Sequence, residues 1–226
     1  MSTPFGFLAR KTRFLNRWHA RRATRVKAVT AFVSSPEPRT IGSFAKGRQL
    51  VAGNYLFAGA LVEAPGVDLW DVNAPDKAFV EALHGFAWMD DLAAVGDAST
   101  LEVGQRWLWS WIDQFGNGHG PGWTPDLTGR RLIRWINHAL FLLRGNEVSQ
   151  SDAFYQSLAQ QTRFLSKRWH AAAPGLPRFE ALTGLIYAGL SLEGMEELAA
   201  PAVAALSREC TDQIDDEGGL PTRNPE

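Results

Sequence analysis

From residue 76 onward, apolar residues recur at steps of three and four, the spacing that places them on one face of a helix. Short polar or glycine-rich stretches separate successive runs of this pattern. The predicted helices span residues 76–95, 98–115, 128–143, 151–171, 177–192 and 195–214. Because short connections make neighbouring helices antiparallel, we expect an all-α fold, an incomplete α/α toroid of antiparallel helical hairpins. No sequence repeat is visible, which disfavours a regular solenoid.

This pattern divides the chain into three regions. They are a basic amphipathic N-terminal helix, an irregular linker and the α/α-toroid domain, over residues 1–33, 34–75 and 76–226. Within the linker, apolar residues interrupted by Gly53 and Gly59 predict short strands or an irregular segment near residues 47–63. At the other end, Pro225-Glu226 is typical of the first turn of a further helix, so we expect a toroid domain truncated at its C-terminus.

Charge is unevenly distributed along the 226 residues. The net charge is −1, but residues 1–30 contain eight basic residues and no acidic one, so the remainder carries −9. An overall charge near zero gives no indication of a nucleic-acid partner. The N-terminal helix could contact an anionic membrane surface, or it could pack on the domain with a solvated basic face, which is the commoner arrangement.

Composition adds limits on compartment and chemistry. No apolar run is long enough for a transmembrane helix, and no signal-peptide core follows the basic N-terminus, so the sequence itself indicates a cytoplasmic protein. The single cysteine, Cys210, excludes an internal disulfide and is expected to be a small buried residue. Nine tryptophans are compatible with sugar-binding platforms, although aromatic residues more often form the core. No nucleotide-binding or metal-binding motif occurs.

The side chains best suited to binding a ligand or to catalysis lie in residues 122–140, a Gly/Pro-rich loop followed by a helix. Thr128 is predicted to cap this helix with its hydroxyl. Its buried stripe is predicted to consist of Leu132, Ile136, Ala139, Leu140 and Leu143. Its polar side chains are Arg130, Arg131, Arg134, Asn137 and His138. Such a cluster suits the binding of an anion, although arginines on a helix are more often solvated or paired with surface acids.

Two segments have a recognisable pattern. Residues 123–136 read Trp-Thr-Pro-Asp-Leu-Thr-Gly-Arg-Arg-Leu-Ile-Arg-Trp-Ile, and residues 218–225 read Gly-Gly-Leu-Pro-Thr-Arg-Asn-Pro. In this order they are similar to the Trp–Pro–Arg–Trp-Ile and Asp-Gly-Gly…Arg-Ser-Pro segments of the heparinase II/III family of polysaccharide lyases. The resemblance covers roughly residues 65–226. It implies an α/α toroid followed by a β-sandwich, with a glycan in the cleft between them.

The resemblance also implies an activity, β-elimination on a uronic-acid polysaccharide of the glycosaminoglycan or alginate type. For this chain we predict no cofactor and no metal-ligating residues. The resemblance implies a periplasmic or envelope location. In such a reaction, Asn, His or Arg donors must neutralise the substrate carboxylate as the carbanion forms. By their places in the two motifs, Arg131, Arg223 and Asn224 match family positions. By their place on the helix, Asn137 and His138 are the candidates for carboxylate neutralisation.

The candidate site therefore has two groups of residues. The catalytic candidates are Asn137, His138 and Asn224, and the substrate-binding candidates are Trp123, Arg131, Arg134 and Arg223. We expect the two motifs to meet across one groove that holds an acidic polysaccharide or oligosaccharide. The sequence departs from the family in three ways. It ends before or at the position of the catalytic tyrosine, it lacks the β-sandwich, and it has Thr222 in place of an acidic residue.

Two other functions stay open. A glycoside hydrolase on a toroid would need paired carboxylates, for which Asp90-Asp91 or Asp215-Asp216 are the candidates. Adjacent acids on a helix point in different directions, which counts against that function. The other alternative is a non-catalytic glycan-binding or helical scaffold protein, which the absence of the tyrosine and the β-sandwich favours.

Overall fold

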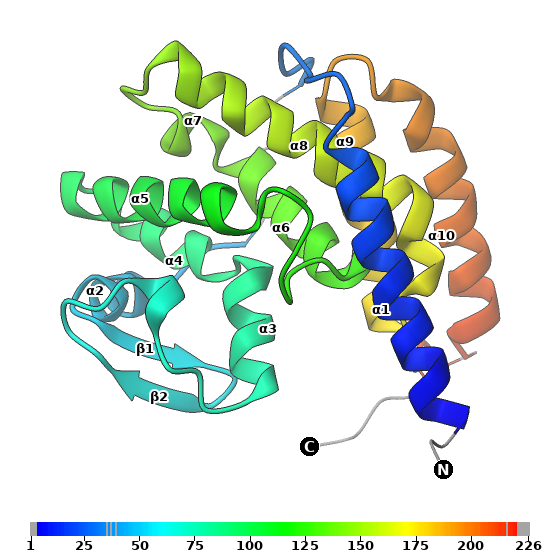
Figure 1. Ribbon diagram of the computed structural model, residues 1–226, viewed down its shortest axis with the longest axis horizontal. Helices are drawn as coiled ribbons and strands as arrows, with labels where there is room; N and C mark the ends of the chain where they lie inside the picture. Colours follow the sequence, from blue (N-terminus) through cyan, green and yellow to red (C-terminus); the bar gives the residue numbers. More distant parts are fainter. Residues whose placement is uncertain (1–3, 35, 37, 39, 216, 221–226) are drawn as a thin grey trace.

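The computed structural model describes residues 4–34, 36, 38, 40–215 and 217–220 (Figure 1). It is mostly helical, with 66% helix and 5% strand, so the predicted all-α class is confirmed at that level. Helices α9 and α10 lie together in one half of the molecule, the β-hairpin lies in the other half with α2 and α3, and α8 extends from beside α7 toward α9 (Figure 1). None of the described helices is long and apolar enough to cross a membrane.

The strands expected near residues 47–63 form a small antiparallel hairpin. Strand β1 (Asn54–Phe57) pairs with β2 (Ala60–Glu63) across a two-residue turn. Gly59 in this turn has a φ of 82°, in the left-handed region that tight hairpins require. The start of the predicted segment is instead helical, because α2 (Phe44–Val51) packs its buried side against α4.

The single helix expected over residues 76–95 is two helices, α3 (Lys77–Gly85) and α4 (Trp88–Val95). The break lies at Phe86, whose φ of 60° is left-handed, an uncommon conformation for a bulky residue. The ring is fully buried and contacts four tryptophans, Trp70, Trp88, Trp111 and Trp135. Burial of this ring among aromatic neighbours holds the chain in a conformation that helical periodicity does not predict.

The helix expected from Thr128 begins earlier and ends earlier. Helix α6 (Pro125–Asn137) starts on proline, the residue suited to a first helical position, and Thr124 is its N-cap residue. Thr128 is therefore not the cap. Its buried hydroxyl lies inside the helix and accepts a hydrogen bond of 3.4 Å from Nη2 of Arg131.

At its other end, α6 stops at His138, where the backbone leaves the helical region, and a single further turn, α7 (Ala139–Leu142), follows. This break changes the direction of the later side chains. Leu140, expected in the buried stripe, is 84% exposed, whereas Leu132 and Ile136 before the break are buried as predicted.

The remaining helices lie close to the predicted ranges. They are α5 (Ala98–Phe115), α8 (Val148–Arg168), α9 (Leu176–Ser191) and α10 (Ala199–Gln213). Short 3-10 helices lie beside them, namely η1 (Leu69–Asp71), η2 (Trp169–Ala171) and η3 (Glu196–Leu198). Helix α8 is capped by Glu147 and Gln150 in a capping box. Cys210 on α10 is half-buried.

Aromatic side chains form the centre of the core. Seven of the largest fully buried side chains are aromatic, namely Trp107, Trp111, Trp135, Phe79, Phe86, Phe154 and Phe164. Trp111 meets Phe86 and Trp135 edge to face, and Trp135 stacks on Phe154 at a centroid distance of 5.6 Å, both arrangements that aromatic rings favour. These tryptophans are therefore structural and present no face to a sugar ring.

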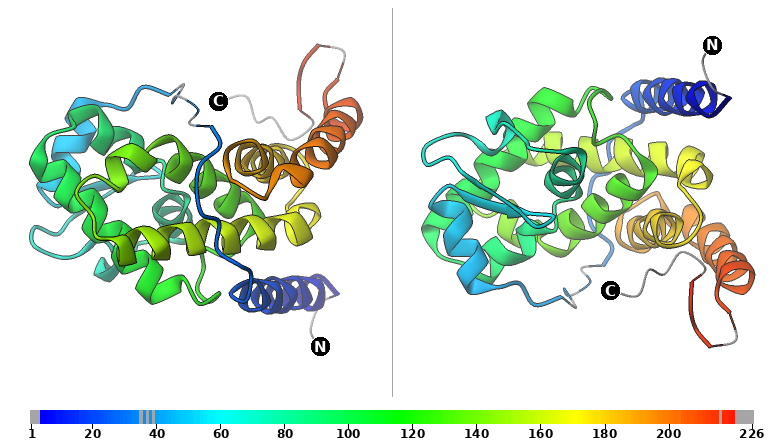
Figure 2. Two further views of the ribbon diagram at one scale, coloured as in Figure 1. Left: turned by 90° about the horizontal axis from the view of Figure 1, so that it is seen from above. Right: turned by 90° about the horizontal axis from the view of Figure 1, so that it is seen from below.

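The N-terminal helix α1 (Pro4–Ala23) ends ten residues before its predicted end. Beyond a turn, the chain becomes extended, as β-branched residues such as Val29 favour, and Phe32 forms a bridge with Leu192. Ala20 and Ala23 on α1 are buried against the body of the molecule. In both views of Figure 2, α1 lies beside α8 on the outside of the helical body.

The closest approach of two helices is the crossing of α6 and α9, which pack most extensively against each other. It depends on Gly129 and Gly184. A Cβ on Gly184 would lie 2.4 Å from the Cα of Gly129, and a Cβ on Gly129 would lie 2.3 Å from the carbonyl oxygen of Glu180. The backbones are thus in contact, and neither position has space for a methyl group.

We expect Gly184→Ala to lower the free energy of unfolding by about 2 kcal/mol or more, because the two helices must separate to admit the methyl group. Urea unfolding measures the change. Gly85→Ala is the matched control, because the nearest atoms to its new Cβ belong to side chains, those of Arg130 at 3.4 Å and Leu127 at 3.8 Å. The control should stay within about 1 kcal/mol of the parent. Equal effects from both substitutions would contradict the close crossing.

Candidate functional site

Arg131, predicted to bind substrate, is fully buried in the core. Its guanidinium donates to Oε1 of Gln161 at 2.7 Å, to the carbonyl of His84 at 2.9 Å and to the carbonyl of Gly122 at 3.2 Å. The guanidinium carbon lies 4.1 Å from the centroid of the Trp111 ring, a cation–π contact.

This environment leaves Arg131 no surface on which to bind an external ligand. Burial lowers the pKa of Arg131 to about 9, so the side chain is still a cation at neutral pH. The donors of Arg131 are occupied by groups of the protein itself. Arg131 is therefore a structural residue, and not the substrate-binding residue that the sequence predicted.

Trp123, predicted to line the substrate groove, is also almost completely buried. Its indole nitrogen donates to the carbonyl of Phe115 at 2.8 Å, and its ring packs against Trp111 and Phe164. Only an edge borders a groove of about 690 Å³ between α1 and the loop before α6. The ring face is unavailable for stacking on a sugar.

Arg134 and His138 converge on one buried carboxylate, that of Asp90. His138 Nε2 lies 2.7 Å from Oδ1 of Asp90, Arg134 Nε lies 3.4 Å from Oδ2, and the Thr40 hydroxyl donates to Oδ2 at 3.0 Å. Burial by itself would raise the pKa of Asp90, but the hydrogen bond from His138 and the charge of Arg134 outweigh it and lower the pKa. The cluster ties α4, α6 and the segment before α2 together.

This geometry also counts against the paired carboxylates that a glycoside hydrolase would need. Asp90 is held by His138, whereas Asp91 accepts a hydrogen bond of 2.7 Å from the backbone nitrogen of Ser43. In the second pair, Asp215 accepts backbone hydrogen bonds within its own turn, and Asp216 lies outside the described residues.

The two motifs are not brought together by the residues that the structure describes. Asn137 borders a separate groove of about 400 Å³ beside Leu140 and Tyr155, away from the cluster that holds His138. Arg223 and Asn224, predicted to complete the site, lie outside the described residues. Of the predicted set, Arg131 and Trp123 pack near the same Trp111 ring, and Arg134 and His138 share Asp90.

The most evident exposed apolar surface among the described residues lies instead on α1. Large apolar side chains on α1 are exposed to solvent, namely Phe7, Leu8, Phe14 and Trp18. A groove of about 640 Å³ runs between the end of α1 and α8, with Trp18 and Arg22 on one wall and Lys167 on the other. The sequence predicted the basic amphipathic helix but not the contribution of α8, because that wall depends on the tertiary fold.

Comparison with known proteins gives one informative similarity. No family model and no solved structure matches the chain. The chain is similar to FtsZ-localized protein C of Caulobacter vibrioides (strain NA1000 / CB15N), with 29% identity over 197 residues. The matched part is 84% of this chain and 33% of that protein, so the chain spans about a third of the relative's length.

This similarity corrects the functional expectations. The relative is named for its localisation with FtsZ and has no link to heparinase-type lyases. The prediction of a polysaccharide lyase, with its enzyme class and its acidic polysaccharide partner, is therefore wrong. The burial of Arg131 and Trp123 agrees with this correction, because both residues were expected at an open cleft.

We expect Arg131→Met to lower the free energy of unfolding by about 3 kcal/mol or more, because four buried acceptors lose their donor. Chemical denaturation followed by circular dichroism measures the change. Arg106→Met is the control, since Arg106 is half-exposed and reaches Asp68 only at 3.5 Å. It should cost no more than about 1 kcal/mol. If Arg131→Met left the free energy of unfolding almost unchanged, the buried cation would not be structural.

His84 gives a pH prediction. Its Nδ1 accepts a hydrogen bond of 3.0 Å from Trp111, and burial together with the charge of Arg131 lowers its pKa to about 3. Between pH 6.5, the ordinary pKa of histidine, and about pH 3, this histidine binds a proton in the unfolded chain but not in the folded protein. The free energy of unfolding should therefore fall as the pH drops through this range. Urea unfolding at several pH values, with NMR of the imidazole, tests this, and a His84 ring that titrates near pH 6.5 would contradict it.

Proposed function

We propose that this chain is a non-enzymatic helical interaction module of a protein that associates with FtsZ in the bacterial division machinery. The observation that carries this proposal is the similarity to FtsZ-localized protein C, which extends over 84% of the chain. A similarity of that extent involves the helical body and not a single motif, which supports a comparable overall role.

The structure supplies a second line of support, an exposed surface fitted for contact with another macromolecule. Helix α1 has apolar side chains in solvent beside basic ones. In contrast, His138 and Arg131, predicted as a catalytic and a substrate-binding residue, are buried and bonded to Asp90 and Gln161. Exposed apolar side chains beside charged ones are typical of interaction sites. A role in binding therefore agrees with the geometry better than a role in catalysis.

The α/α toroid remains a proposal about the fold. Its support is the short connection between α8 and α9 and the packing of α10 on α9, as successive helical hairpins require. A structure of a longer form of the protein tests it. Further hairpins that continue the curvature toward a closed ring would support the toroid, and a helical bundle with no such continuation would contradict it.

The proposed function predicts that the purified chain sediments with FtsZ polymers. In the presence of GTP, the chain should appear in the pellet with FtsZ, and without GTP it should remain in the supernatant. A fluorescent fusion in the source bacterium should accumulate where FtsZ does and disperse when FtsZ is depleted. A chain that stays in the supernatant and is diffuse in cells would contradict an association with FtsZ.

A further inference from the structure

Helix α1 presents three different surfaces around its circumference. One faces the body of the molecule and contains Asn16, Ala20 and Ala23, which are buried. Another contains Phe7, Phe14 and Trp18, at steps of seven and four along the helix, with exposed fractions of 66%, 67% and 46%. Such steps place the three apolar side chains in a row on one face, the arrangement that a partner helix contacts. The third is basic and contains Arg10, Arg13, Arg17 and Arg21.

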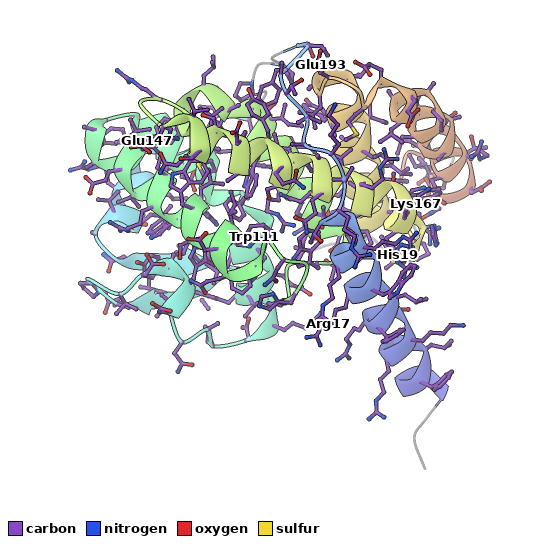
Figure 3. The ribbon with its side chains drawn as sticks, turned by 45° about the horizontal axis from the view of Figure 1, so that its top comes forward. Arg17, His19, Trp111, Glu147, Lys167 and Glu193 are labelled. Atoms are coloured by element: carbon purple, nitrogen blue, oxygen red, sulfur yellow. The ribbon has the colours of Figure 1, made fainter. Side chains whose placement is uncertain are left out.

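The apolar row leads into the groove between α1 and α8. Trp18, Ala23 and Val26 give this groove apolar surface, and its cations come from both helices, namely Arg22, Arg25, Arg163 and Lys167. Arg22 lies over the Trp18 ring at 5.4 Å, which holds a charge beside the apolar row. Figure 3 shows His19 on α1 beside Lys167 on α8, at the same end of the molecule.

The positive charge of this region is not balanced within the described part of the chain. None of the basic side chains of α1 forms an ion pair with a described residue, and Arg163 reaches Glu197 only at 4.0 Å. Burial lowers the pKa of His19, and the charges that lower it further are all on cationic or imidazole groups, namely Arg168, His170, Arg22 and Lys167. An anionic occupant would relieve this repulsion.

We propose that the groove between α1 and α8, continued by the row of Phe7, Phe14 and Trp18, binds an acidic amphipathic helix of a partner protein. Its apolar side packs on this row, and its carboxylates face Arg22 and Lys167. The concave shape, with walls from two separate helices, fits a helical segment better than the flat surface of a bilayer. The inference rests on the proposed role as an interaction module, but not on FtsZ being the partner.

The experiment uses a fluorescein-labelled synthetic peptide as the probe. It is about 20 residues long, the length of α1, rich in glutamate, and has leucines at steps of three and four. A peptide of the same composition in scrambled order has no apolar face. Fluorescence anisotropy should show binding of the first peptide, weaker binding of the scrambled one, and loss of affinity as salt rises, because the contact is partly electrostatic.

Variants of the protein locate the binding surface. Arg22→Glu combined with Lys167→Glu should weaken binding about tenfold or more, because attraction becomes repulsion. Trp18→Ala should weaken it about fivefold, through loss of the aromatic contact. Arg208→Glu, an exposed charge reversal on α10, is the matched control and should leave the affinity unchanged. Circular dichroism verifies that each variant is folded.

Several results would overturn the inference. These are equal binding of the scrambled peptide, no effect of the groove variants, and binding to phosphatidylglycerol vesicles in place of the peptide. The last result would make α1 a membrane contact. Peptide binding without FtsZ co-sedimentation would overturn the proposed function alone. Co-sedimentation without peptide binding would overturn this inference alone.

Discussion

The buried guanidinium of Arg131 is the contact on which the arrangement of the central helices depends. It joins α6 to the end of α3, to the glycine-rich loop and to α8, through His84, Gly122 and Gln161. The Thr128 hydroxyl is a fourth acceptor. Each acceptor is shielded from water, and a planar group with five donors can serve all four at once, whereas a lysine has only three donors. The Trp111 ring occupies the space over its face. This one cation therefore fixes the position of α6 in the core.

The sequence predicted best the helices whose limits depend on local signals. Helices α5 and α9 lie within one or two residues of expectation, because Asp97 caps the first and Pro177 stands in the first turn of the second. The breaks at Phe86 and His138 escaped prediction because their causes are distant in sequence. One is the aromatic cluster around Trp135, and the other is the carboxylate of Asp90.

The candidate site shows a different limit of sequence reasoning. Arginine, histidine and asparagine in one short stretch suit the recognition of a carboxylate, but the same donors suit a buried polar network equally well. A signal was present, since Arg131 lies four residues after Leu127 and four before Trp135, in the middle of the apolar stripe. The basic helix was visible in the pattern, whereas the groove beside it required Arg163 and Lys167 from a distant helix.

The extended segment after α1 connects the N-terminal helix mechanically to the end of α9, which is distant in sequence. Val33 donates to the carbonyl of Ser191 at 2.9 Å, and Glu193 donates to the carbonyl of Ala31 at 3.1 Å. Tension applied to α1 would pass through these two main-chain bonds into the end of α9, in parallel with the hydrogen bonds that Gln156 and Gln160 of α8 donate to the carbonyls of Val26 and Ala20. The segment acts as a tether, so that a load applied at the outer helix is transmitted to the end of α9.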